Sequence, residues 1–231
     1  MKKLVRFGAW LAAAAAAVFL VVQLTYMARL WWWRDHNPDM TAFMSARLEQ
    51  IRSHDPKAML QQAWIPYARL SPHLKRAIVV AEDARFVDHE GFDWDAIEKA
   101  REKNQKRGRV VAGGSTISQQ LAKNLFLSGE RTPWRKGQEA LITVMIEHVM
   151  DKRRILEIYL NVIEWGDGVF GAEAAARHYY GIGAAAVGPE AAARLAGMIP
   201  NPRYYDHHRN TRWLERKTQM ILARMPQAEL P

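Results

Sequence analysis

The sequence predicts a mainly α-helical protein in which one N-terminal transmembrane helix precedes a single domain. Three observations support this fold class. An uncharged apolar run lies near the N-terminus, apolar residues recur at helical spacing through the remainder, and only residues 109–112 resemble a short strand. The 231 residues suit one domain of ordinary size with an appendage.

The composition limits the possible chemistry. The chain has no cysteine, which excludes disulfides, Cys-ligated zinc, iron–sulfur clusters and a thiol nucleophile. It carries 33 Lys and Arg against 24 Asp and Glu, a formal net charge of +9. Anionic partners are therefore expected: nucleic acid, anionic lipid head groups or phosphorylated substrates.

Residues 7–28 form the predicted membrane anchor. These 22 residues include no charged side chain, and as a helix they rise roughly 33 Å, enough to cross a hydrocarbon core of about 30 Å. Tryptophans at 31–33 suit the lipid–water interface. Basic residues within the tail 1–6 favour a cytoplasmic N-terminus and an exported domain, although Arg29 and Arg34 reduce the asymmetry.

A cleaved signal peptide is the alternative, since Ala12–Ala17 offers small residues for cleavage. Cleavage there would leave only Phe7–Leu11 as a clearly apolar core, whereas the most apolar part, Val18–Leu24, lies beyond it. The length of the span favours an uncleaved anchor. The predicted order is tail 1–6, anchor 7–28, interfacial linker and helix 29–59, and main domain 60–225.

Periodicity and capping residues place the helices that follow. Apolar residues at helical spacing predict a helix over 40–51. Ser71 is expected to cap a helix that begins with Pro72, and Asp93 another that continues through 99–109. The remaining predicted helices are 115–127 capped by Ser115, 132–150, 155–163 ended by Gly166-Asp167-Gly168, 189–199 stopped by Pro200-Asn201-Pro202, and 212–225.

The first candidate site lies in residues 81–91. Glu82 stands four residues after Ile78, so it lies along the apolar face of its helix. A carboxylate in such surroundings should have a raised pKa, which suits proton transfer. The alternative is a structural carboxylate paired with Arg85 or His89.

The second candidate site lies in residues 113–124. Gly113 and Gly114 run into a helix start with Ser115 and Thr116, a geometry that can offer backbone N–H groups to an anion. The same helix carries a polar patch made of Gln119, Gln120, Lys123 and Asn124. The alternative is a capped surface helix after a flexible turn.

The third candidate site contains Arg131, Arg135, Lys136 and Glu139. It reads either as a cationic lining around a second carboxylate or as solvated salt bridges of little energetic value. The histidines lack metal-ligand spacing, so no metal site is predicted, and serine acyl-enzyme motifs are missing from the sequence. A poised base beside cations, tethered to a membrane, suits transfer from a phosphate-activated lipid donor.

Five segments resemble the signatures of the peptidoglycan glycosyltransferases. They are Glu-Asp-x-x-Phe-x-x-His-x-Gly at 82–91, Gly-Gly-Ser-Thr-Ile-Ser-Gln-Gln-x-x-Lys-Asn at 113–124, Arg-Lys-x-x-Glu at 135–139, 154–161 and 195–202. The anchor and the short length resemble the monofunctional biosynthetic branch. The resemblance implies a lysozyme-like helical fold with a membrane-contacting jaw, on the periplasmic side of a bacterial inner membrane.

The resemblance also implies roles for the site residues. Glu82 would be the base in the polymerisation of lipid II, with Glu139 as a second, supporting carboxylate. Lys123, Arg131, Arg135 and Lys136 would hold the donor diphosphate. The other implied substrate-binding residues are Asp83, Phe86, His89, Gly114, Ser115, Thr116, Gln119, Gln120 and Asn124. No cofactor is required, although Glu139 could orient a divalent cation.

The expected partners are lipid II, the nascent glycan strand, membrane lipid and proteins of cell division or elongation, with no nucleic acid. A lytic transglycosylase or muramidase is the rival enzyme, but it needs no diphosphate site. A membrane-anchored binder of acidic polymers is the non-enzymatic rival. The basic stretch 99–109 reads either as a solvated helix end or as a flap over the cleft.

Overall fold

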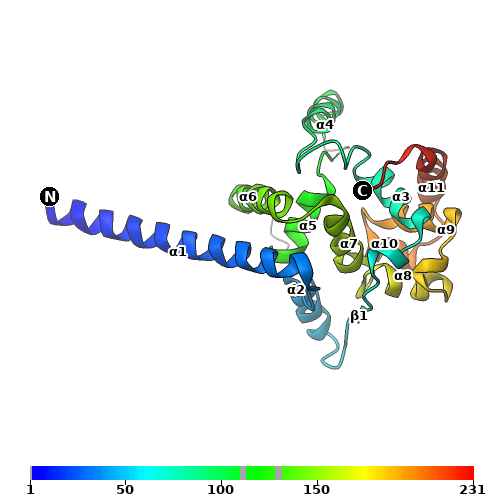
Figure 1. Cartoon of the computed structure of the whole chain (residues 1–231), viewed down its shortest axis with the longest axis horizontal. Coiled ribbons are helices and arrows are strands. Elements are labelled where there is room, and N and C mark those ends of the chain that lie inside the picture. Colours follow the sequence, from blue (N-terminus) through cyan, green and yellow to red (C-terminus); the bar gives the residue numbers. More distant parts are fainter. Residues whose placement is uncertain (1, 110–112, 128–131) are drawn as a thin grey trace.

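The computed structural model describes residues 2–109, 113–127 and 132–231. It confirms the mainly helical class: a long N-terminal helix projects from a body built largely of shorter helices (Figure 1). The anchor helix α1 runs from Lys2 to Asp35, followed by α2 (Ala42–Arg52), α3 (Pro72–Glu82), α4 (Trp94–Arg107), α5 (Ile117–Phe126), α6 (Pro133–Val149) and α7 (Lys152–Val162). After these come α8 (Ala172–Tyr180), α9 (Pro189–Met198), α10 (Pro202–His207) and α11 (Arg212–Arg224).

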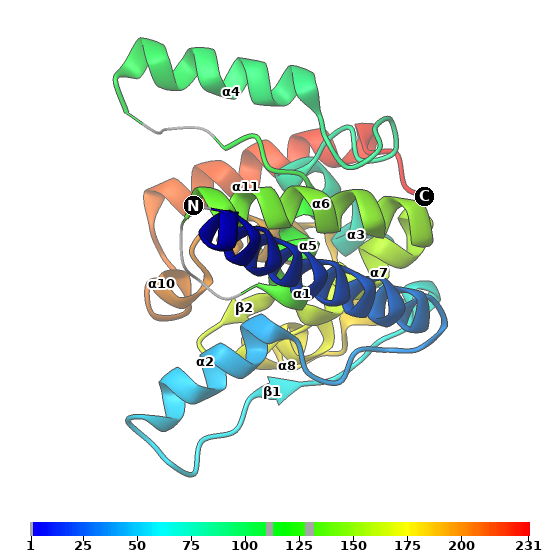
Figure 2. The same cartoon turned by 90° about the vertical axis from the view of Figure 1, so that its left-hand side faces the viewer.

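Helix α1 is long and apolar enough to cross a membrane over Val5–Asp35. It does not end at residue 28, where the span is predicted to end, because its last turns belong to the body. Leu30 is fully buried there, and Arg154 donates hydrogen bonds to the Trp33 carbonyl oxygen at 3.0 and 2.9 Å. Farther up the helix, Gln23 Nε2 donates to Gln138 Oε1 of α6 at 3.0 Å. Figure 2 shows α1 passing beside α6.

Capping side chains start several helices where the sequence predicts. The Ser71, Asp93 and Thr132 side chains accept hydrogen bonds from the backbone N–H groups at the starts of α3, α4 and α6. One prediction is wrong by a residue, since Thr116 caps α5 in place of Ser115. Thr116 has the advantage of a partner, because Gln119 three residues later completes a capping box with it.

The structure contains elements that the sequence analysis missed. Helices α8 and α10 were not predicted, and Pro202 begins α10 at a place where a helix stop was expected. A small sheet joins β1 (Gln61–Gln62), β3 (Val169–Phe170) and β2 (Glu164–Gly166), with β1 parallel and β2 antiparallel to β3. Asp167 and Gly168 thus form the turn between β2 and β3. Residues 110–112 of the predicted strand lie outside the described residues.

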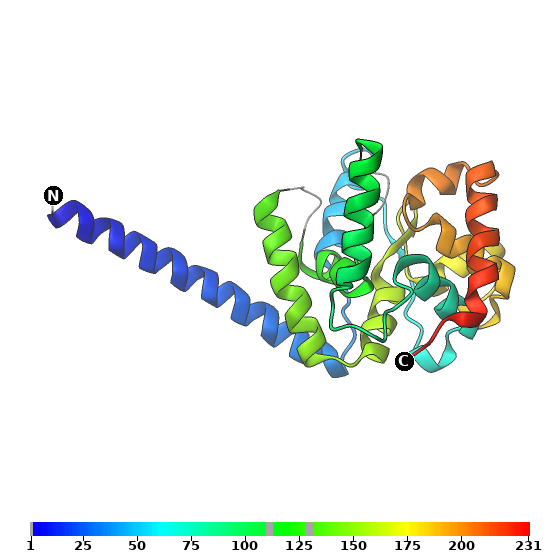
Figure 3. The same ribbon diagram turned by 90° about the horizontal axis from the view of Figure 1, so that it is seen from above.

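The core is centred on α7, whose Ile155, Leu156, Ile158 and Leu160 side chains are fully buried. Helices α5 and α6 pack together beside it, and α3, α9 and α11 pack against one another at the other end of the body. Figure 3 shows the α6 and α11 groups on opposite sides of the body, and α4 stands apart from the body in Figures 1 and 2. The described residues also form short 3₁₀ turns at Tyr67–Arg69, Ala184–Ala186 and Met225–Gln227.

Candidate active site

Glu82 is the last residue of α3, whose Leu74, Ala77 and Ile78 side chains are buried in the core. Its Oε2 atom accepts a hydrogen bond of 2.8 Å from Gln120 Nε2 of α5. Burial raises the pKa of Glu82, while the Gln120 hydrogen bond and the positive charge of Lys217 oppose the rise. The group is therefore a better proton acceptor than an exposed carboxylate.

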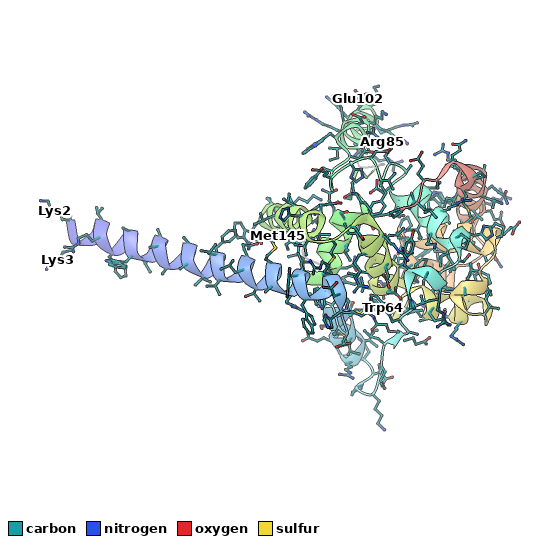
Figure 4. The ribbon with its side chains drawn as sticks, in the orientation of Figure 1. Lys2, Lys3, Trp64, Arg85, Glu102 and Met145 are labelled. Atoms are coloured by element: carbon teal, nitrogen blue, oxygen red, sulfur yellow. The ribbon has the colours of Figure 1, made fainter. Side chains whose placement is uncertain are left out.

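The alternative reading of Glu82 as a structural ion pair is not supported. Arg85 faces the acidic groups of the α4 start and forms a short salt bridge with Asp95. Figure 4 shows Arg85 near the base of α4. His89 is paired with Asp83, at 2.9 Å between Nε2 and Oδ1. Both proposed partners of Glu82 are thus committed to other carboxylates.

Asp83, Phe86 and His89 hold the loop after α3 in place. The second carboxylate oxygen of Asp83 accepts a hydrogen bond from the Ile117 N–H at 3.0 Å, which ties the loop to the start of α5. Phe86 is fully buried, with the Lys152 ammonium 4.7 Å from its ring centroid. These three residues therefore fix the position of Glu82 relative to α5 and α7.

Three of the backbone N–H groups at the start of α5 already have partners within the protein. Its Thr116 N–H donates to Gln119 Oε1, its Ile117 N–H to Asp83, and its Gln119 N–H to Thr116 Oγ1. Those three donors are used within the protein, and Asp83 already places a negative charge there. Gly114 has a packing role instead, because an added Cβ would lie 2.9 Å from the Ile97 Cα of α4.

The next turn of α5 lines a polar pocket of about 370 Å³, and cationic side chains lie around this pocket. The pocket contains most of the predicted polar patch together with segments far away in the chain. Its lining residues include Gln120, Lys123, Asn124, Arg135, Tyr159, Glu164, Asn201 and Arg203. A second cavity of about 460 Å³ contains Glu82, Ser115 and Thr116. The hydrogen bond between Glu82 and Gln120 connects the two cavities.

The residues of the third candidate site line different cavities. Glu139 is buried, 4% exposed, and contacts Lys136 Nζ through a short salt bridge and Arg135 Nη1 at 3.5 Å. Arg135 lines the polar pocket, whereas Lys136 lines a third cavity beside α4 with Ser115 and Gln119. Arg131 lies outside the described residues. Glu139 therefore holds two cations in place.

A divalent cation does not fit these residues. The Glu139 carboxylate already faces two cationic side chains, which would repel a metal ion. Across residues 2–109, 113–127 and 132–231, no three His, Cys, Asp or Glu side chains come close enough to share one.

An apolar groove lies beside the polar pocket, between α1 and α6. It has a volume of about 780 Å³ and is lined by Phe19, Val22, Tyr26, Trp134 and other residues of the two helices. The Phe19 and Trp134 ring centroids are 5.9 Å apart. Arg135 lines both the groove and the polar pocket. A cationic side chain therefore stands where an apolar channel meets a polar one.

Sequence reasoning missed three contributors to this site. Tyr159 is a core residue of α7, yet its hydroxyl donates to Gln120 Oε1 at 2.9 Å. Lys217 lies on α11, far from any motif, and its charge acts on Glu82. Arg203 follows the fifth motif and lies 3.8 Å from Glu164. The sequence offered one signal for two of these residues: Tyr159 lies within the fourth motif and Arg203 directly follows the fifth. It offered no such signal for Lys217.

Comparison with known proteins agrees with the geometry. A family model described as Transglycosylase matches residues 47–226. Curated relatives named biosynthetic peptidoglycan transglycosylase come from Nitrosospira multiformis (64% identical; 93% of this chain, 94% of the relative), Chromobacterium violaceum (61%; 95% and 96%) and Dechloromonas aromatica (60%; the full length of both). The domain of this family has a helical, lysozyme-like fold, in agreement with the helices described above. The chain belongs to the family of biosynthetic peptidoglycan transglycosylases.

Proposed function

We propose that this chain polymerises lipid II into linear glycan strands for the bacterial cell wall. It would act as a glycosyltransferase, in keeping with the names of its full-length relatives. The observation that carries the proposal is a pair of cavities joined by the hydrogen bond between Glu82 and Gln120: one holds the partly buried Glu82 carboxylate with its raised pKa, and the other holds Lys123 and Arg135.

The geometry supports a direct displacement. Glu82 accepts the proton of the acceptor 4-hydroxyl, and that oxygen attacks the anomeric carbon of the growing strand. The bond between this carbon and the diphosphate breaks with inversion, and undecaprenyl diphosphate leaves. Lys123 and Arg135 balance the charge of the departing diphosphate, so it needs no proton. Arg203 adds a third cation to the same pocket.

The apolar groove supports a lipid-linked donor. A diphosphate beside Arg135 would lie at the mouth of the groove between α1 and α6. Its polyprenyl chain could then follow Trp134 and Phe19 back into the bilayer along α1. This placement gives the charged and the apolar parts of one substrate separate, adjoining surfaces.

The orientation in the membrane belongs to the proposal. Lys2 and Lys3 lie at the end of α1 far from the body (Figure 4), and basic residues favour the cytoplasmic side. The catalytic body would then lie on the periplasmic side of the inner membrane. Contact with proteins of cell division or elongation also stays a prediction of the resemblance.

The lytic rival requires separate consideration, because a raised pKa on Glu82 would equally suit a general acid. Hydrolysis of a glycan releases no diphosphate and involves no lipid. A lytic enzyme would therefore have no use for the Lys123 and Arg135 cations or for the adjoining apolar groove. A non-enzymatic binder would likewise leave the raised pKa of Glu82 unexplained.

The test is to supply the full-length protein, in vesicles, with lipid II and separately with purified peptidoglycan. We expect polymer from lipid II on a gel, blocked by a moenomycin-type inhibitor, and no soluble fragments from peptidoglycan. Glu82→Gln is the control for activity from a contaminant. Fragment release without polymer would establish the lytic alternative, and turnover of neither substrate would favour the binder.

A further inference from the structure

We propose that Tyr159 is a positioning residue which, acting through the Gln120 amide, keeps Glu82 in its ionised, proton-accepting form. The inference rests on the proposed role of Glu82 as the base. Its basis is a chain of two hydrogen bonds across three helices. Tyr159 of α7 donates to Gln120 Oε1 at 2.9 Å, and Gln120 Nε2 of α5 donates to Glu82 Oε2 of α3 at 2.8 Å.

Tyr159 determines which atom donates and which accepts in these two hydrogen bonds. Tyr159 is fully buried, and burial, with the negative charges of Glu82 and Asp83, raises the pKa of its hydroxyl well above the ordinary value. The hydroxyl therefore stays protonated and remains a donor. Because an amide has its oxygen on one side and its NH₂ on the other, the Gln120 oxygen that faces Tyr159 leaves the NH₂ facing Glu82.

This orientation favours one protonation state of the base. An amide N–H stabilises a carboxylate, whereas an amide oxygen could hydrogen-bond only to a protonated carboxyl. Turning the amide over would present its oxygen to Glu82 and would take the acceptor from the buried Tyr159 hydroxyl. A buried O–H without an acceptor is unfavourable, so Tyr159 resists the turn.

Other charged groups act on Glu82 independently of Tyr159. Lys123 of α5 and Lys217 of α11 favour the carboxylate, and the neighbouring Asp83 disfavours it. The cavity that Glu82 lines also contains Arg85, Asp93, Asp95, Lys99 and Arg224. None of these groups changes when the Tyr159 hydroxyl is removed, so the contribution of Tyr159 can be measured separately.

The experiment compares pH profiles of kcat/KM for lipid II polymerisation by the full-length protein in vesicles. Tyr159→Phe keeps the buried ring and removes only the hydroxyl. We expect the midpoint of the acidic limb to move up by about one pH unit, equivalent to roughly tenfold lower kcat/KM below the midpoint. The rate on the alkaline plateau should change much less, because Glu82 itself is intact.

A matched control is Tyr179→Phe. Tyr179 is partly buried, and its hydroxyl donates to the backbone oxygen of Trp165 at 2.9 Å. Its removal tests the loss of a hydrogen-bonded tyrosine hydroxyl elsewhere in the body, and the acidic limb should not move. Gln120→Met breaks the chain at its middle and should move the limb upward. The double variant Tyr159→Phe/Gln120→Met should move it no further than Gln120→Met does, because Tyr159 acts through Gln120.

Three results would overturn the proposal: an acidic limb that stays in place in folded Tyr159→Phe, a loss of rate that is equal at every pH, or additive shifts in the double variant. If Tyr159→Phe does not fold, an unmoved limb in Gln120→Met overturns the proposal instead. A wild-type protein that makes no polymer would defeat the proposed function, and it is distinguished from these outcomes by the absence of any profile.

Discussion

Glu82 is held between two opposing influences. Its place at the end of an apolar helix face removes water from the carboxylate and raises its pKa, whereas the Gln120 amide and nearby lysines stabilise the anion. A general base works best when its pKa lies near the operating pH. Burial moves the pKa of Glu82 in that direction, and the hydrogen bond and the lysines limit the rise.

Replacing Glu82 with glutamine should abolish most of the polymerisation. The substitution keeps the size of the side chain and removes the proton acceptor, and loss of a general base typically costs about 10²–10⁴-fold in rate. The measurement is the initial rate of polymer formation from lipid II. A folded Glu82→Gln protein within a few-fold of the wild-type rate would show that Glu82 is not the base.

The same variant should unfold at the same or a higher temperature than wild type near pH 7. Because the folded-state pKa of Glu82 is raised, the folded protein binds the proton more tightly than the unfolded chain does. The free energy of unfolding therefore falls as pH rises through the unfolded and then the folded pKa. An uncharged glutamine escapes this penalty, and its advantage should fade as pH is lowered. Thermal unfolding at several pH values checks it, and a lower midpoint at pH 7 would contradict it.

Lys123→Ala should slow polymerisation without unfolding the protein. Lys123 lines the polar pocket, and losing one charge-assisted contact to a developing anion costs about 2.7–4 kcal/mol in the barrier, by analogy with oxyanion sites. Lys57→Ala, at an exposed position, is the matched control for charge alone. Equal rates for the two variants would return Lys123 to the role of a solvated surface residue.

Short sequence motifs identified the candidate site residues that lie within them, but not those that reach the site from elsewhere in the chain. Glu82, Lys123 and Arg135 were identified because each belongs to a short segment with a distinctive spacing. Lys217 could not be identified in this way, because its effect on Glu82 depends on the packing of α11 near α3. Tyr159 was hidden for another reason: its ring belongs to the core, and only its hydroxyl reaches the site.

Helix α4 carries the basic stretch, and its two ends face different surroundings. All the basic side chains of the stretch are exposed, and two of them, Lys99 and Arg101, also line cavities of the site. Each basic side chain near an anionic surface is worth about 1 kcal/mol, and salt screens the effect. If α4 contacts substrate or lipid, neutralising the four cations that follow, Lys103, Lys106, Arg107 and Arg109, should weaken that contact and flatten its dependence on ionic strength.

The measurement is the initial polymerisation rate as a function of salt concentration, for wild type and the fourfold variant. The pH profile is the control, since it reports Glu82 and should stay unchanged. Superimposable salt curves would favour the reading of α4 as an ordinary solvated helix.

The helices that the sequence predicted have strong local signals, and those it missed do not. Ser71, Asp93 and Thr132 mark helix starts through their own side chains. Helix α8 instead begins at Gly171 without a side-chain cap. The strands are only two or three residues long and exist because residues 61–62 meet 169–170, a pairing across more than a hundred positions. Such contacts leave no periodic pattern in either segment.

The whole molecule should lose stability when the base of α1 is removed. A chain beginning at residue 36 lacks Leu30 and Trp33, which are 0% and 6% exposed in the body. Each buried large apolar side chain contributes about 1.5–3 kcal/mol, so the unfolding midpoint should fall by at least ~6 °C. A chain beginning at residue 20 keeps both side chains and is the control. Equal midpoints in detergent would show that α1 is a dispensable tether.

The continuity of α1 sets the height of the reaction above the bilayer. Its 34 residues correspond to roughly 51 Å of helix, against about 30 Å of hydrocarbon. The second half of α1 packs on α6, and Arg154 holds its last turn, so the helix is attached to the body at more than one point. Two lipid-linked sugars diffusing in the same leaflet would then reach the cleft at a single fixed depth. The substrates would then reach Glu82 by lateral diffusion in the membrane alone, because the length of α1 fixes the distance between the cleft and the bilayer.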